Sequence, residues 1–177
     1  MIKEFSVNPL PQNNSARIIF TATLLSSFLI FVLYFSVELY RGIIGLVGLG
    51  FITATITIYT KYLSSFLYYD VTFDSDQTPV FVVRRRTGKK QTTLCRIDLG
   101  SIISVTREDK KERRAHKRDR GVSQYVYIPT MLPDVTYRLY SKSRYETSEI
   151  VIECQEEFAA LLDSMAKEAA ALLTESE

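Results

Sequence analysis

The chain has 177 residues, enough for one domain with an appendage, and its formal net charge is only +2. One histidine and two cysteines far apart in the sequence, Cys95 and Cys154, exclude a zinc site built from the usual Cys and His ligands. The charge is unevenly spread: residues 61–120 carry fifteen Lys and Arg against eight Asp and Glu, whereas residues 121–177 carry four against ten. Such a basic segment either faces a polyanion or forms one solvated side of the fold.

The N-terminal third of the chain contains two long uncharged segments. Residues 1–15 hold two prolines and three asparagines and are predicted to form a loose cytoplasmic tail. Residues 18–37 and 42–60 carry no charge and are separated only by ELYR. Because a bilayer core of about 30 Å is crossed by ~20 apolar helical residues, we predict a two-span transmembrane hairpin over residues 16–67. A signal peptide is disfavoured, since a second span follows the first at once.

The charges that flank the spans indicate an orientation. An even number of spans puts both termini on one side, which is flanked by Lys3, Arg17 and Lys61, against Arg41 in the short connection. This bias predicts a multi-pass protein of the cell (cytoplasmic) membrane with both termini in the cytoplasm. A disulfide between the two cysteines is not expected in that compartment.

Small residues recur along the second span, where they let helices approach closely. They are Gly42, Gly45, Gly48, Gly50 and Ala54. Packing against the first span is the expected use, and a homo-oligomer interface is the alternative.

After residue 67 the pattern changes to short strand-like segments separated by turn-forming residues. In the sixth of them Val135, Tyr137 and Leu139 share one face and Arg138 lies on the other, which is typical of a half-buried antiparallel strand. In the TGKK turn, Gly88 is expected to supply a positive φ. Seven strands are predicted, at residues 69–74, 80–86, 91–98, 102–107, 124–128, 135–141 and 149–154.

The last predicted element is an amphipathic helix over residues 155–173. It is expected to pack across a sheet or to close the end of a barrel, and its length is short for a coiled coil. Its apolar stripe consists of Phe158, Leu161, Leu162, Met165 and Ala169.

Seven antiparallel strands followed by one amphipathic helix is the element order of the pleckstrin-homology (PH) superfold. With the helical hairpin in front, the chain resembles bacterial membrane proteins that carry a PH-like domain. The most similar segment is residues 80–105, VFVVRRRTGKKQTTLCRIDLGSIISV, in which Ile97, Leu99, Ile102 and Val105 match the apolar spacing of the family. For residues 68–177 the resemblance implies an α+β domain, a PH-like seven-stranded antiparallel β-barrel or sandwich capped by the C-terminal helix. It implies little about activity.

The segment 107–120, REDKKERRAHKRDR, departs from that family because it is longer than expected. Twelve of its fourteen residues are charged. Opposite charges at helical spacing, such as Asp109 with Arg113, are typical of a solvated helix or loop. His116 is accordingly expected to be a solvated surface histidine. The net positive charge also suits the anionic cytoplasmic leaflet, where each Lys or Arg contributes about 1 kcal/mol.

Two basic segments are therefore candidates for contact with anionic lipid headgroups, the 84–90 hairpin and the first part of the 107–120 segment. Because successive side chains of a strand point to opposite faces, the three arginines of the hairpin cannot all converge. Nucleic acid is not an expected partner, since no aromatic residues are interleaved with the cations. The candidate lipid contacts are Arg84, Arg85, Arg86, Lys89, Lys90, Lys110, Lys111, Arg113 and Arg114.

The sequence contains no recognisable catalytic arrangement. No phosphate-binding loop or nucleophile elbow is present, and residues 70–76, DVTFDSD, lack the glycine and terminal glutamate of a calcium loop. We expect no enzyme activity, cofactor or metal. The predicted function is a membrane-surface binding or scaffolding module. The alternative is an adaptor subunit of a membrane complex, in transport, secretion or envelope stress, that binds a protein through an edge strand or the acidic C-terminal helix.

Overall fold

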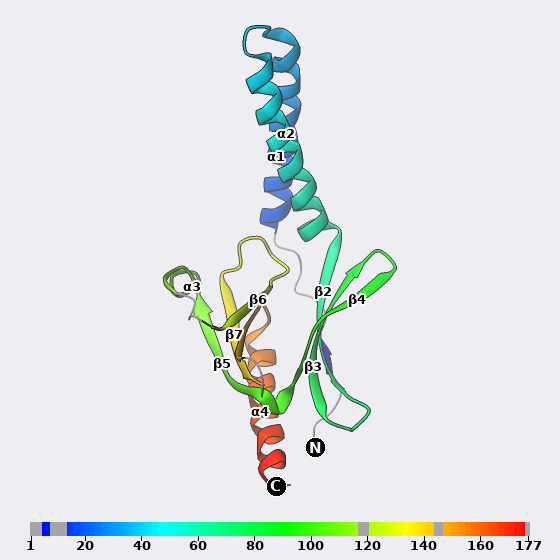
Figure 1. Ribbon diagram of the computed structural model, residues 1–177, viewed down its shortest axis with the longest axis vertical. Coiled ribbons are helices and arrows are strands. Elements are labelled where there is room, and N and C mark those ends of the chain that lie inside the picture. The colour runs from blue at the N-terminus through cyan, green and yellow to red at the C-terminus, as the bar shows by residue number, and fades with distance from the viewer. Residues whose placement is uncertain (1–4, 8–13, 117–120, 144–146, 176–177) are drawn as a thin grey trace. The chain divides into compact units, whose positions relative to one another are not determined.

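The computed structural model describes residues 5–7, 14–116, 121–143 and 147–175. It divides into a helical unit, residues 12–65 with 130–132, and a β domain formed by the remainder of the chain. Each unit is described by itself below (Figure 1).

The helical unit is an antiparallel pair of helices, α1 (Asn14–Ser36) and α2 (Arg41–Ile58), with α2 continued by a π-helical turn, Tyr59–Leu63. With its π-helical turn α2 has 23 residues, as α1 does, and both are long and apolar enough to cross a membrane. Their apolar side chains are almost all exposed, so they do not form the core of a soluble domain. The threonine hydroxyls bond to carbonyls one turn earlier, as Thr57 does to Thr53 at 2.8 Å, which removes their need for water.

Two of the five predicted helix-packing residues lie between the helices. A Cβ added to Gly45 would lie 3.3 Å from the Tyr34 ring, and one added to Gly48 would lie 3.2 Å from Ile30. These two glycines therefore allow α1 and α2 to approach closely. A Cβ at Gly42 or Gly50 would meet open space, and Ala54 is exposed, so these three do not pack against α1; their use in a homo-oligomer stays a prediction.

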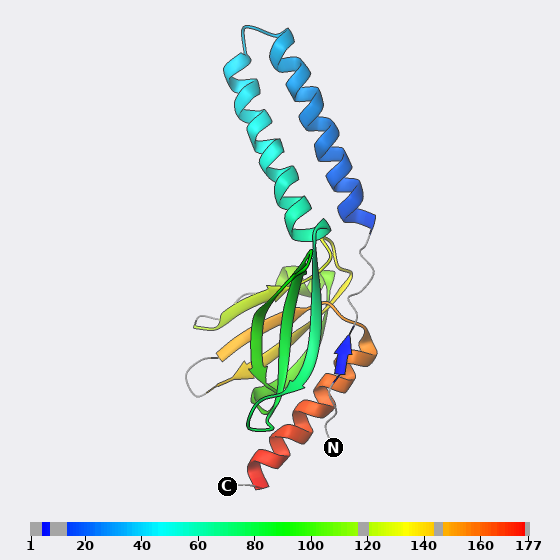
Figure 2. The same ribbon diagram turned by 90° about the vertical axis from the view of Figure 1, so that its right-hand side faces the viewer.

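The β domain contains two four-stranded sheets and two helices (Figures 1 and 2). All seven predicted strands are present, with shifted ends. The first sheet has the order β1-β2-β3-β4, with β1 (Phe5–Val7), β2 (Ser65–Phe73), β3 (Pro79–Thr87) and β4 (Lys90–Asp98). The second has the order β5-β7-β8-β6, with β5 (Ile102–Asp109), β7 (Val135–Lys142), β8 (Thr147–Ile152) and β6 (Ser123–Tyr127). A 3-10 turn, Leu99–Ser101, joins the sheets, and the helices are α3 (Lys110–Ala115) and α4 (Glu156–Glu175).

Two fold predictions were wrong, and of the predicted alternatives, a barrel or a sandwich, the barrel is not formed by the part of the chain that the structure describes. Residues 5–7 of the predicted loose tail form β1, which pairs antiparallel with β2 and places Phe5 opposite Val71. The sequence FSV alternates apolar and polar residues, which suits a strand at the edge of a sheet. β6 runs parallel to β8, with Gln124 opposite Glu149. The sequence pattern had predicted antiparallel strands throughout. Neither sheet closes into a barrel within the described residues, so the domain is an α+β fold with two open sheets. Gly88 does have a positive φ, +59°, as predicted.

The hydrophobic core lies between the two sheets and α4. It includes Phe81 and Val83 from β3, and Leu139 and Ile150 from the second sheet, all at most 1 % exposed. The α4 stripe differs from the prediction at one position, since Leu161 is 37 % exposed. The α4 residues that are buried are Phe158, Ala159, Leu162, Met165, Ala166 and Ala169.

A buried tyrosine ties the first sheet to the second. The hydroxyl of Tyr69, on β2, donates to the carbonyl of Tyr127 at 2.6 Å and accepts from the backbone N–H of Glu153 at 3.4 Å. Burial raises the pKa of Tyr69, so the phenol stays neutral and keeps its donor. This one side chain therefore satisfies backbone groups next to the ends of β6 and β8.

Both cysteines are free, and Cys154 is buried in the core. Burial, and after it the charge of Glu153, raises the pKa of the Cys154 thiol from 9.0 to about 12. In the unfolded chain the thiol ionises near its ordinary value, so unfolding releases a proton between pH 9 and 12. We therefore expect the free energy of unfolding to fall across this window, with Cys154 contributing up to about 1.4 kcal/mol per pH unit. Denaturant titrations at pH 8, 9.5 and 11 measure the slope, and Cys154→Ala should reduce it; an unchanged slope would contradict this assignment.

Candidate functional site

The outer face of the second sheet, the one turned away from the core, carries a buried ionic network. The predicted alternation along β7 is confirmed: Tyr137 and Leu139 face the core, and Arg138 faces the opposite side. That opposite side is not solvated, however, because Arg138 is only 2 % exposed. A buried arginine requires partners, since desolvating a charge without a compensating one is costly.

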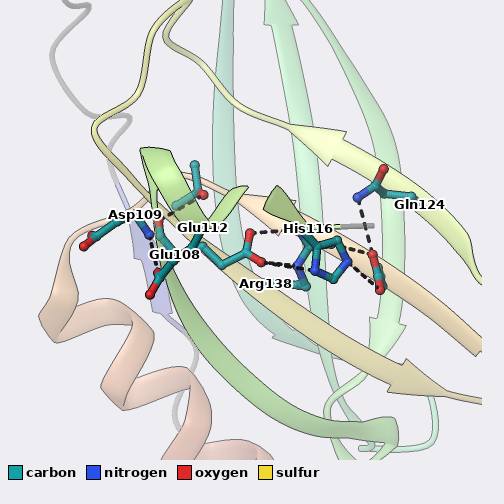
Figure 3. A network of polar contacts seen from close by, with 8 residues as sticks. Glu108, Asp109, Glu112, His116, Gln124 and Arg138 are labelled. Carbon is teal, nitrogen blue, oxygen red and sulfur yellow. Dashed lines mark hydrogen bonds and ion pairs between the residues drawn. The ribbon is translucent and has the colours of Figure 1, made fainter. Parts of the chain in front are cut away.

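The partners of Arg138 come from the two strands that flank β7 (Figure 3). Glu108 on β5 accepts from Nε of Arg138 and from Nη2, both at 2.8 Å, which is a bidentate pair. Glu149 on β8, fully buried, accepts from Nη1 through Oε2. Burial alone would lower the pKa of Arg138, but the hydrogen bond to Glu108 and the charges of both carboxylates raise it overall, so the guanidinium stays charged.

The charged segment is placed over this network by a short capped helix. Asp109 is the N-cap of α3, and its backbone N–H donates to the Glu112 carboxylate at 2.9 Å, which completes a capping box. Arg113 donates through Nη2 to the carbonyl of Pro133 at 3.2 Å. At the other end, the backbone N–H of His116 donates to the Glu112 carbonyl at 2.8 Å. The helix therefore directs the side chain that follows it, His116, back onto the sheet.

His116 lies between the two carboxylates of the network. Its Nδ1 is 3.7 Å from Oε1 of Glu108, and its Nε2 is 3.4 Å from Oε1 of Glu149. Gln124, on the neighbouring β6, donates to Oε2 of Glu149 at 3.3 Å (Figure 3). The prediction of a solvated histidine was wrong, since the His116 side chain is 22 % exposed and faces two buried acids.

The ionic network was not predicted from the sequence. Its members Glu108, Arg138 and Glu149 are single charged residues on three strands that are neighbours in the sheet. Glu108 was assigned to the loop, because the fourth strand was predicted to end at residue 107, whereas β5 continues to Asp109. Arg138 was assigned to the face opposite Tyr137 and Leu139, and Glu149 was predicted only as the first residue of the last strand. The order β5-β7-β8 brings all three together, and this order depends on tertiary contacts that the local pattern does not contain.

The nine predicted lipid contacts divide into partly buried and exposed cations. Arg84 pairs with the buried Asp70 at 3.3 Å, and Arg113 is held by Pro133 as described above. Arg85 is half-buried, so these three residues are poorly placed to meet a lipid. The remaining six are exposed: Arg86, Lys89 and Lys90 on the β3–β4 hairpin, and Lys110, Lys111 and Arg114 on α3.

The two groups of exposed cations lie at the same end of the β domain. β2 begins at Ser65, two residues after the π-helical turn ends at Leu63. The tip of the β3–β4 hairpin returns to the end at which β2 begins, and α3, at the far end of β5, lies at that end too (Figures 1 and 2). The start of β2, which lies at this end, therefore follows the helical hairpin directly in the chain.

No family model matches the chain, and the searches of curated proteins and of solved structures find no match. Within the described ranges, no group of three His, Cys, Asp or Glu side chains is arranged to hold a metal ion. The two carboxylates of the network are paired with one guanidinium and approached by an imidazole.

Proposed function

We propose that the chain is an integral protein of the cytoplasmic membrane, anchored by α1 and α2, whose cytoplasmic β domain binds or scaffolds at the anionic membrane surface. The observation that carries this proposal is that six exposed cations lie, in two separate groups, at the end of the β domain where β2 begins (Figures 1 and 2). Each cation near an anionic leaflet contributes about 1 kcal/mol of binding free energy. Six cations would therefore favour one orientation of an already anchored domain by up to several kcal/mol.

A PH-like fold is part of this proposal. Seven strands in two sheets, followed by one amphipathic helix that packs on them, support it. The parallel β6–β8 pair and the additional β1 are departures from that pattern. A domain of this kind acts through its surface, which agrees with the position of the exposed cations.

Lysine footprinting of the whole chain tests the proposal without any mutation. The protein is placed in nanodiscs of neutral or of anionic lipid and treated briefly with an amine-reactive ester, and modified lysines are counted by mass spectrometry. We expect Lys89, Lys90, Lys110 and Lys111 to react severalfold more slowly in anionic nanodiscs, because headgroups cover them. High salt should abolish the difference, since it screens these contacts.

Lys167 on α4 is the internal control. It is exposed and, among the residues that the structure describes, pairs with Asp163 at 2.6 Å, so its reactivity should not depend on the lipid. Equal reactivity of all five lysines in both lipids at low salt would rule out the anionic surface as the partner of this domain.

The second candidate function is a protein-interaction adaptor, and an edge strand favours it. β6 is the last strand of its sheet, and Tyr125 and Val126 on it are 42 % and 57 % exposed. An edge strand with exposed apolar side chains can accept an added strand from a partner. This function remains if the lysines show no protection by lipid.

A further inference from the structure

The polar network places one imidazole between two buried carboxylates. Histidine is the side chain that changes charge between pH 5 and 8. A neutral imidazole has one N–H, whereas an imidazolium has two. Since one nitrogen of His116 faces Glu108 and the other faces Glu149, only the charged ring directs a donor at each carboxylate.

The charge balance of the network favours that proton. Glu108 and Glu149 carry two negative charges and Arg138 one positive charge, so the network has an excess of one negative charge when His116 is neutral. On its own element, the Glu112 carboxylate is occupied in the capping box, Arg113 is held by the carbonyl of Pro133, and Arg114 is exposed to solvent. Tyr140, which lies opposite Glu149 in the β7–β8 register, stays neutral in this range, since burial raises its pKa. A proton on His116 therefore balances the network.

One oxygen of Glu149 also lacks a hydrogen-bond donor among the described residues. Oε2 of Glu149 accepts from both Arg138 and Gln124. Oε1 of the same carboxylate is buried and has no hydrogen-bond partner among the described residues, and neither has the Nε2 of His116 that lies 3.4 Å from it. A buried carboxylate oxygen without a donor is unfavourable. A proton on Nε2 of His116 would bring a donor and a positive charge to 3.4 Å from this oxygen, close enough to bond after a small movement of the ring.

We propose that His116 is a proton-dependent latch that holds α3 on the second sheet. In its charged form it closes the network with Glu108 and Glu149 and fixes the end of α3. When it loses the proton, the hold weakens and the segment 110–116, with the exposed cations Lys110, Lys111 and Arg114, opens more often. The inference goes beyond the proposed function and does not rest on it, because it concerns the attachment of α3 and not what α3 meets.

Hydrogen exchange of the whole chain in neutral nanodiscs tests the latch, since neutral lipid removes any contribution from anionic headgroups. Wild type and His116→Gln are compared at pH 5.5 and again at pH 8, so that the intrinsic pH dependence of exchange cancels in each ratio. At pH 5.5 we expect the amides of 110–116 to exchange about tenfold faster in the variant, the effect of one charge-assisted hydrogen bond on an equilibrium. At pH 8 the ratio should approach one. The amides of α4, which does not contact the network, serve as the control.

A second variant separates the latch from a purely structural role of the ring. In Glu149→Gln the remaining pair of Glu108 and Arg138 is already balanced with a neutral His116, so a proton is no longer needed. We expect this variant to lose most of the pH dependence of exchange in 110–116 while α3 stays protected at pH 8. A ratio of His116→Gln to wild type that is the same at both pH values, or full pH dependence in Glu149→Gln, would overturn the proposal.

Discussion

Replacing Arg138 by methionine should lower the free energy of unfolding of the β domain by about 3–5 kcal/mol, the cost of leaving a buried charge without its partner. Methionine fills much of the same volume, so the loss comes from charge rather than from a cavity. Glu108 and Glu149 would remain buried, one of them fully, with only His116 to offset two negative charges. The loss should be smaller at pH 5.5, where histidine is charged, than at pH 8.

The chain offers a direct way to measure this unfolding. It has no tryptophan, but the buried Cys154 thiol becomes reactive only when the core opens. Pulse alkylation across a denaturant series, read at Cys154 by mass spectrometry, therefore reports the unfolding of this domain. Since Cys95 is only partly buried, its labelling is read separately.

Lys167→Met is the matched control for Arg138→Met. It removes a cation from an ion pair whose lysine side chain is 74 % exposed, and such pairs contribute less than about 1 kcal/mol. Combining Arg138→Met with Glu108→Gln and Glu149→Gln should recover part of the loss, because the unpaired charges are then gone. A loss below 1 kcal/mol in Arg138→Met alone would mean that the carboxylates reach water, in contradiction to their burial.

The elements of this fold could be predicted from the sequence, because each is encoded locally. The two apolar segments correspond to α1 and α2. Short strand-like segments between turn-forming residues, several of them with period-two alternation, located the seven strands of residues 65–152. The β1 strand was missed because three residues beside two prolines give almost no periodic signal, and its pairing with β2 is a contact across more than sixty residues. The parallel β6–β8 pair was missed for the same reason, since the order of strands is a tertiary property.

The candidate site was harder to predict than the fold. Charged residues on a strand are normally read as solvent-facing, and the 107–120 segment looked like a solvated loop because of its composition. In the structure Arg138 pairs with two carboxylates from the neighbouring strands, on a face that His116 helps to cover. The position of each of these residues is therefore explained only by the others. The exposed cations, by contrast, were found by composition alone, since six of the nine predicted ones are exposed.

The second large effect on stability is expected on α4, where two neighbouring leucines test which residues form the buried stripe. Leu162 is fully buried between the sheets and α4, whereas its neighbour Leu161 is 37 % exposed. We expect Leu162→Ala to lower the free energy of unfolding by about 2–5 kcal/mol, through lost burial and the cavity left behind. Leu161→Ala, with the same chemistry on the same helix, should cost under about 1 kcal/mol, since little apolar area leaves the core. Both are measured by Cys154 labelling across a denaturant series, and equal losses would place α4 in a different rotation. Because helix propensity changes identically in the two variants, the difference between them reports only the face that α4 turns to the core.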